Sequence, residues 1–310
     1  MKSDLDHLPP QKQWELDHIK DVVFAEFDKA MGAHRLTAES ADWRRHGRIQ
    51  WIILFGSYAR GDWVDEPQTT KGYKSDYDLL IIVSHKEILE LTNLWFEIDE
   101  HLMRDKRIKT PVTFILETRD SINSALAQGQ YFFNDIRKQG VALHQLPNAR
   151  LKEPAPLTTQ EAYDKAQEYF DIWLKNAKTS MKVARFCVSE GDLNEAAFNF
   201  HQATERIYNA LLLTLTSYCP PTHNLKALRS LSEDLDRSLV DIWPRAGRRD
   251  QAAFNKLVNA YVKARYSKHY VITAEELHWL DARITPLHDQ IETLCRSHLS
   301  ALAKKAGAAG

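Results

Sequence analysis

Cysteine is scarce in this sequence, a dominant charge of either sign is absent, and no long apolar run occurs. The three cysteines, Cys187, Cys219 and Cys295, are too few and too widely spaced for a disulfide framework or a CxxC metal motif. The 41 basic residues nearly balance the 42 acidic ones, which excludes a uniformly basic nucleic-acid binder and an acidic tail protein. Without a bilayer-length apolar run or a signal-peptide core, we expect a soluble, cytoplasmic protein with no membrane partner.

Apolar and aromatic residues, by contrast, are plentiful. Hydrophobic residues make up 44% of the chain and aromatic residues 10%, including eight tryptophans. This content supplies enough apolar surface for packed cores and excludes a disordered chain. At 310 residues, the length is typical of about two domains.

The two halves of the chain differ in their hydrophobic pattern. In the first half, short apolar and β-branched runs indicate buried strands at 51–55, 78–83 and 111–116, with helical patterns before and between them. This order predicts an α/β or α+β domain built on a small sheet over residues 1–145. Three prolines within residues 146–159 predict a semi-rigid linker that makes few contacts.

The second half, residues 160–305, shows helical periodicity only. Apolar residues spaced by three and four positions predict five helices, which short connections would arrange as an antiparallel bundle. The first helix has capping residues at Thr158 and Thr159 and an end at Gly191. Pro286 lies inside the last apolar stripe, where we expect it to kink the helix or end its first segment.

One stretch of the first half carries residues that bind phosphates and metal ions. The first predicted strand ends in Gly56 and Ser57, where a glycine permits close approach and the serine offers backbone and hydroxyl donors to a phosphate. About twenty residues on, Asp76 and Asp78 lie two positions apart at the entry to a strand, so their carboxylates share one face. Such a pair suits Mg²⁺ ions bridged by nucleotide phosphates. Arg60 is placed to serve the same site or to pair with an acidic neighbour.

Each of these features alone is common in ordinary turns and strand ends, but their order within one strand–loop–strand unit is specific. GSYARGD followed by SDYDLLII resembles the GSxxRG…SDxDL signature of minimal nucleotidyltransferases of the polymerase-β-like superfamily. The resemblance implies a small mixed sheet flanked by helices, and transfer of a nucleotidyl group from an NTP such as ATP with release of pyrophosphate. By position, it implies that Gly56, Ser57 and Arg60 hold the triphosphate. Asp76 and Asp78 would be the catalytic ligands of Mg²⁺.

The chain departs from this signature at a third carboxylate, which active members usually carry on the following strand. Thr113 occupies that position in the run PVTFILE. Glu117 shares the same alternating face but lies four residues further on, roughly 13 Å along the strand. Because the third carboxylate helps to activate the attacking hydroxyl, the departure bears on catalysis more than on nucleotide binding.

Three polar segments stand out in the helical half: HQATE, THNL and ARYSKHY. Arg265 and His269 are four positions apart, so on a continuous helix they share a face. An arginine beside a titratable histidine can bind a phosphodiester and move protons, as metal-independent ribonucleases do. Seven basic residues against one acid in 245–269 favour a polyanion such as RNA, although such a stretch is more often a solvated face. His201 and His223 are more often hydrogen-bonding residues between helices than catalysts.

In combination, the three segments resemble a HEPN domain, a helical module found beside minimal nucleotidyltransferases, often as the toxin of a toxin–antitoxin pair. The resemblance implies that the two modules are fused here and that the chain forms a homodimer through its helices. It also implies adenylylation of a tyrosine beside the arginine–histidine motif, for which Tyr266 and Tyr270 are the counterparts. HEPN ribonucleases place four to six residues between the arginine and the histidine, whereas three separate Arg265 from His269.

Three hypotheses follow from the sequence. The leading one is a nucleotidyltransferase–HEPN fusion that binds ATP with Mg²⁺ and transfers AMP to a hydroxyl, such as that of a HEPN tyrosine. The alternative is a metal-independent HEPN ribonuclease that uses Arg265 and His269 and is regulated by a nucleotide-sensing first domain. A third hypothesis is a non-catalytic nucleotide-binding scaffold, which both departures from the family motifs favour.

Overall fold

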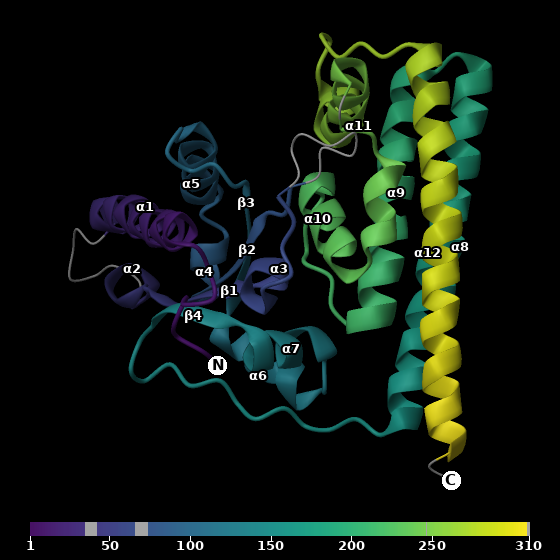
Figure 1. Cartoon of the computed structure of the whole chain (residues 1–310). Coiled ribbons are helices and arrows are strands. Elements are labelled where there is room, and N and C mark those ends of the chain that lie inside the picture. Colours follow the sequence, from purple (N-terminus) through teal and green to yellow (C-terminus); the bar gives the residue numbers. More distant parts are fainter. Residues whose placement is uncertain (35–41, 66–73, 246, 309–310) are drawn as a thin grey trace. The chain divides into compact units, whose positions relative to one another are not determined.

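The computed structural model of the chain describes residues 1–34, 42–65, 74–245 and 247–308. It divides into two compact units, the first within residues 1–155 and the second from residue 156 onward. The first unit combines a sheet with helices and the second is helical, so the predicted α+β class is confirmed (Figure 1). None of the helices in the described ranges combines the length and the apolar character that crossing a membrane requires.

The described part of the first unit is built on a four-stranded mixed sheet in the order β3-β2-β1-β4. β1 (Ile49–Phe55) pairs antiparallel with both β2 (Tyr77–Val83) and β4 (Val141–Gln145), while β2 pairs parallel with β3 (Val112–Thr118). The sequence predicted the first three strands, of which β1 and β2 are almost fully buried and β3 is partly buried. It did not predict β4, in which only Val141 is fully buried.

Helices cover both faces of this sheet. On one face, a single apolar core joins β1 and β2 to three helices: α1 (Pro10–His34), α4 (Lys86–Leu89) and α5 (Thr92–Arg104). The short α2 (Asp42–His46) precedes β1, and α3 (Gly56–Arg60) follows it directly. Strand residues that alternate with those of this core, such as Phe55, point to the other face. The helices that cover this second face are α6 (Arg119–Ala127) and α7 (Tyr131–Gln139). The ring of Phe55 packs edge to face against that of Phe132 on α7.

Residues 146–155 pack against the first unit instead of forming a linker with few contacts. The indole Nε1 of Trp51 donates a hydrogen bond to the carbonyl of Ala149 (2.6 Å), and Ala149 is buried. The N–H of Ala155 donates to the carbonyl of Leu126 (3.0 Å). The prediction of few contacts is therefore wrong for residues 146–155, which belong to the first unit. Proline restricts the backbone but leaves the carbonyls and the remaining N–H groups free to pair.

The second unit is a helical bundle, as predicted. Its α-helices are α8 (Thr159–Glu190), α9 (Leu193–Thr216), α10 (Leu225–Leu235), α11 (Arg248–Tyr266) and α12 (Ala274–Ala308), with a 3₁₀-helix, η1 (Arg237–Ile242), after α10. A reciprocal capping box between Thr158 and Glu161 starts α8, and Gly191 ends it in the left-handed region at φ 83°. α12 runs through Pro286 without ending there. Packing against α8 and α9 offsets the one backbone hydrogen bond that the proline removes.

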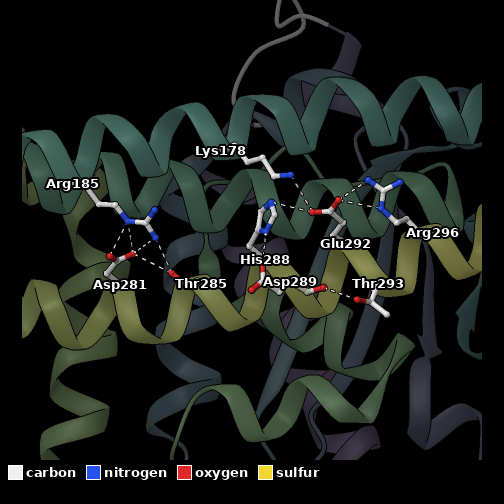
Figure 2. A network of polar contacts seen from close by, with 9 residues as sticks. All are labelled: Lys178, Arg185, Asp281, Thr285, His288, Asp289, Glu292, Thr293 and Arg296. Atoms are coloured by element: carbon white, nitrogen blue, oxygen red, sulfur yellow. Dashed lines mark hydrogen bonds and ion pairs between the residues drawn. The ribbon is translucent and has the colours of Figure 1, made fainter.

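A polar seam joins α8 to α12 (Figure 2). The guanidinium of Arg185 makes a bidentate contact with Asp281 (2.8 and 2.9 Å), and further along Lys178 and Arg296 both contact Glu292. Beneath the seam lies the apolar stripe of α12, whose members are fully buried: Leu277, Leu280, Ile284, Leu287 and Ile291. Because exposed ion pairs add little stability, the apolar stripe supplies most of the stabilisation between these helices.

Candidate functional site

Sheet register brings the predicted phosphate-binding and metal-binding residues to one end of the sheet. Phe55, the last residue of β1, pairs with Asp78 on β2, and Asp78 pairs with Thr113 on β3. Because Gly56 and Ser57 follow Phe55 directly, the Gly-Ser turn begins beside the aspartate. Three segments that are far apart in the sequence therefore meet across adjacent strands.

The backbone at the end of β1 requires its glycine. Gly56 has φ of 72°, in the left-handed region, which lets the extended strand turn at once into α3. Ser57 is fully buried in this turn. Its carbonyl accepts a hydrogen bond from the N–H of Gly61 (2.9 Å), which closes α3. The turn is thus short and fixed, as close approach to a phosphate requires.

The two aspartates lie at the start of β2 with different exposure. Asp78 is 1% exposed, whereas Asp76 is half-buried and accepts a hydrogen bond from the hydroxyl of Thr113 (3.4 Å). Tyr77 lies between them and points to the opposite face, where its hydroxyl donates to the buried Glu15 (3.2 Å). Burial raises the pKa of Tyr77, so its hydroxyl remains a donor. Two carboxylates and one hydroxyl therefore share one face.

This donor set fits a hard cation that is shared with a nucleotide. Mg²⁺ is commonly bound by one or two carboxylates together with substrate phosphates. Within the described ranges, no group of three histidine, cysteine or acidic side chains is placed to hold a metal ion. Glu117 lies opposite Ile82, four positions beyond Thr113, and does not join the two aspartates. Asp76 and Asp78 are thus the two carboxylates of this face that could hold a cation.

Arg60 lies in the last turn of α3, and its Nε donates to Asp62 (3.2 Å). Its charge also acts on Asp135 of α7. Burial raises the pKa of Asp135, and the charges of Lys138 and Arg60 oppose that shift. Of the two roles expected for Arg60, the structure shows pairing with an acidic neighbour.

Lys12 of α1 also reaches this end of the sheet, although sequence reasoning did not select it. Its Nζ donates to the hydroxyl of Thr110 (2.5 Å) and lies 3.6 Å from Asp65. It also lies 5.4 Å from the ring of Tyr58 and 5.8 Å from that of Tyr77. Burial raises the pKa of Tyr58 to about 12. Lys12 thus places a positive charge among the segments that carry the site. The polar sequence around Lys12 contains no motif that would have predicted this position.

In the second unit, a buried glutamate joins two of the three polar segments. Oε2 of Glu205, on α9, accepts a hydrogen bond from Nδ1 of His223 (2.9 Å) and lies 3.5 Å from Nε2 of His201. The other ring nitrogen of His201 donates to the carbonyl of Leu257 (2.9 Å). Burial raises the pKa of Glu205, but its contacts with His201 and His223 outweigh this effect and lower the net pKa. Glu205 is therefore ionised at neutral pH.

Tyr261 of α11 connects this cluster to the third segment. Its ring stacks on that of His223, with centroids 4.0 Å apart, and the guanidinium of Arg265 lies 4.6 Å from the same ring. Arg265 also lies 4.6 Å from the ring of Phe198, and its Nε donates to the carbonyl of Tyr261 (2.8 Å). The HQATE, THNL and ARYSKHY segments thus meet around one tyrosine ring.

A HEPN domain occupies residues 170–280. This match covers α9, α10 and α11 together with most of α8, and it includes all three polar segments. No curated protein matches the chain. The HEPN match does not extend to the first unit, whose resemblance to minimal nucleotidyltransferases rests on sequence motifs alone.

Within the HEPN domain, Arg265 and His269 do not share a helix face. α11 ends at Tyr266, and Ser267 has extended backbone angles of φ −109° and ψ 115°. The N–H of Tyr270 then donates to the carbonyl of Ser267 (3.1 Å), which turns the chain. The shared face required a continuous helix, and that condition is not met, because His269 lies in the turn that follows α11.

The two candidate acceptor tyrosines differ sharply in exposure. Tyr266 is 75% exposed, at the end of α11. Tyr270 is 9% exposed, and its hydroxyl donates to the carbonyl of Lys256 (3.0 Å). Burial also raises the pKa of Tyr270. Tyr266 is thus the candidate whose side chain a reactant can reach.

The basic stretch of the HEPN domain is partly neutralised. Three of its seven basic residues form ion pairs with glutamates: Arg245 with Glu233, Arg249 with Glu275, and Lys256 with Glu276. Lys263, Arg265 and Lys268 are exposed toward its end. An open groove of about 650 Å³ beside Arg265 is also lined by Asp192 and Glu195. The positive character is therefore concentrated at the end of α11.

Proposed function

We propose that the first unit binds a nucleoside triphosphate with Mg²⁺ and transfers its nucleotidyl group to a hydroxyl. The observation that carries the proposal is the register from Phe55 through Asp78 to Thr113, which sets the Gly-Ser turn beside two carboxylates. ATP is the nucleotide that the family resemblance implies. The non-catalytic scaffold of the third hypothesis uses the same binding residues and differs only in lacking the transfer.

Each residue of the site has a role in this reaction. Gly56 allows the triphosphate to approach the backbone, and Ser57 donates hydrogen bonds to its oxygens. Asp76 and Asp78 would hold Mg²⁺, which supplies charge neutralisation at the phosphates. The acceptor oxygen bonds to the α-phosphorus, the bond to the bridging oxygen breaks, and pyrophosphate leaves. Thr113 carries a hydroxyl, which is a poor base, so the proton of the acceptor passes to water.

The test is an intact-mass measurement on the full chain before and after incubation with ATP and Mg²⁺, paired with calorimetric titration of ATP. The expected result is Mg²⁺-dependent binding and a mass gain of one AMP. Asp76→Asn with Asp78→Asn should abolish both. Asp17→Asn is the control for the loss of a carboxylate as such, because it makes one Asp-to-Asn change at an exposed position of α1 paired with Lys20.

The outcomes separate the hypotheses. Binding that persists unchanged in the double variant contradicts the assigned site. Binding without transfer to the chain or to added hydroxyl acceptors supports the scaffold. Absence of any ATP binding by the wild-type chain contradicts both readings of the first unit.

A second candidate function is metal-independent cleavage of RNA by the HEPN domain, with the first unit as its regulator in a toxin–antitoxin-like arrangement. It is favoured by the HEPN match and by the position of Arg265 on an aromatic surface beside a histidine–glutamate cluster. Its cellular test is toxicity. Disabling Asp76 and Asp78 should make expression toxic, and adding Arg265→Ala should relieve that toxicity. Normal growth with intact RNA in the Asp76 and Asp78 variant contradicts the toxin hypothesis.

A further inference from the structure

We propose that His223, held by Glu205, is the proton-transferring residue that acts with Arg265 in the HEPN domain, in the role that the sequence assigned to His269. This inference rests on the second candidate function, cleavage of RNA, and does not depend on nucleotidyl transfer by the first unit. His223 and His269 differ in the contacts that hold their side chains in place.

His223 has the environment of a general base. Its Nδ1 donates to Glu205 (2.9 Å), which fixes the ring orientation and leaves Nε2 as the proton acceptor. Glu205 is 8% exposed and ionised, whereas the side chain of His223 is 52% exposed. A buried carboxylate thus orients a histidine whose ring is accessible to a substrate.

Arg265 contacts the same aromatic ring as His223 of this pair. Its guanidinium and the imidazole of His223 both contact the ring of Tyr261, at 4.6 and 4.0 Å. Arginine binds phosphate oxygens well, and exposed aromatic rings stack on unpaired bases. Phe198 and Tyr266 extend the aromatic surface around the guanidinium. The arrangement therefore fits a phosphodiester of single-stranded RNA.

His269 has none of these supports. It follows the end of α11, its side chain is exposed, and its backbone N–H donates a hydrogen bond to the hydroxyl of Ser267 (3.3 Å). No carboxylate in the described part of the chain is within ion-pair distance of its ring. An exposed side chain without an orienting partner is a poor candidate for a positioned base.

The proposed step conserves atoms and charge. Nε2 of His223 takes the proton of the 2′-hydroxyl, and the 2′-oxygen bonds to phosphorus. The bond from phosphorus to the 5′-oxygen breaks, and the imidazolium returns the proton to that oxygen. The products are a 2′,3′-cyclic phosphate and a 5′-hydroxyl. Arg265 stabilises the charge that develops on the non-bridging oxygens.

Several titratable and charged groups lie around His223 and Glu205. Glu205 and His201 lie on α9, and Tyr261 and Arg265 lie on α11. Cys219, in the connection before α10, is near enough for the charge of Glu205 to raise its thiol pKa, which burial raises further, to about 12. Because Glu205 supplies the orienting charge, Glu205→Gln should displace the pH profile of cleavage as well as slow it.

The experiment uses the full chain, with and without Asp76→Asn and Asp78→Asn, in EDTA and without ATP. The substrates are a 5′-labelled mixed-sequence single-stranded RNA and its DNA counterpart. We expect cleavage of the RNA alone, with 2′,3′-cyclic ends. His223→Ala and Arg265→Ala should each lower the rate on the order of 100-fold. His278→Ala, at an exposed position of α12, is the matched control.

Chemical rescue separates a catalytic role from a structural one. Added imidazole should restore part of the rate of His223→Ala and none of the rate of Arg265→Ala. The proposal is overturned if no variant and no wild-type protein cleaves the RNA, if DNA is cleaved equally, or if His269→Ala abolishes cleavage while His223→Ala retains it. ATP titration of the same samples measures nucleotide binding by the first unit independently of RNA cleavage. The two proposals can therefore fail separately.

Discussion

Asp78 on β2 lies directly opposite Thr113 on the parallel strand β3. The hydroxyl of Thr113 donates to the neighbouring carboxylate of Asp76, which orients that side chain (3.4 Å). A threonine hydroxyl can orient a carboxylate, but it does not accept a proton at neutral pH. In the proposed reaction, Thr113 therefore supplies no general base.

A carboxylate at position 113 should therefore accelerate the reaction. We expect Thr113→Asp to raise the rate of AMP transfer at least about tenfold, because it adds a general base and a cation ligand opposite Asp78. Single-turnover mass spectrometry with ATP and Mg²⁺ measures the rate. Thr113→Val is the control, since it keeps the shape and removes the hydroxyl. An aspartate variant with intact ATP affinity and no faster transfer would contradict the assignment.

The acceptor prediction follows from exposure. If the chain modifies itself on a tyrosine of the ARYSKHY segment, Tyr266→Phe should abolish the modification and Tyr270→Phe should leave it in place. Tyr266 is 75% exposed, whereas the hydroxyl of Tyr270 is engaged by the carbonyl of Lys256. Peptide mapping after incubation with ATP and Mg²⁺ identifies the modified residue. Modification of Tyr270 in the folded chain would show that the turn after α11 opens.

The strands and the Gly-Ser and aspartate motifs were accessible to sequence reasoning because each depends on local chemistry. Buried apolar runs predict β1 to β3, and carboxylates two apart on a strand must share a face. β4 was missed because it is short and only partly buried, and it becomes a strand by pairing with β1. Its existence depends on tertiary contacts.

The end of α11 and the Glu205 cluster were missed for the same reason. No glycine or proline follows Tyr266, so nothing local signals the helix end, and the buried hydroxyl of Tyr270 fixes the turn by a contact with Lys256. His223 and Glu205 are eighteen positions apart, and only the packing of the bundle joins them. Judged singly, each histidine was an ordinary hydrogen-bonding residue.

Acid should selectively weaken one contact in the first unit. Hydrogen bonds from Arg107 and His18 hold the pKa of Asp105 well below its usual range. Asp105 is therefore stabilising above its unfolded pKa of about 4, and this stabilisation is lost as the pH falls toward the lowered folded value. We expect Asp105→Asn to lower the free energy of unfolding by about 1–3 kcal/mol at pH 7. The difference should shrink below pH 4.

Denaturant titration at pH 7 and pH 3 measures this difference. Asp17→Asn is the control, because its exposed pair with Lys20 contributes little at either pH. If Asp105→Asn lowers the free energy of unfolding equally at both pH values, the side chain of Asp105 stabilises the fold by its shape and not by its charge.

The helical unit should fold by itself. A fragment of residues 156–310 retains the Thr158–Glu161 capping box and the buried stripe of α12. We expect it to unfold cooperatively and, as the HEPN resemblance implies, to be a dimer. Circular dichroism and light scattering measure the two properties. A folded monomer would contradict dimerisation through the helices, and an unfolded fragment would contradict the independence of the unit.

The pairing of β4 with β1 has a consequence for biosynthesis. The first-unit sheet is complete at Gln145, and the contacts of Ala149 and Ala155 extend the unit only ten residues further. Because domains generally fold as they leave the ribosome, this unit can reach its final form while the helical half is still being translated. The nucleotide site would then be assembled in the nascent chain before the residues around Arg265 exist.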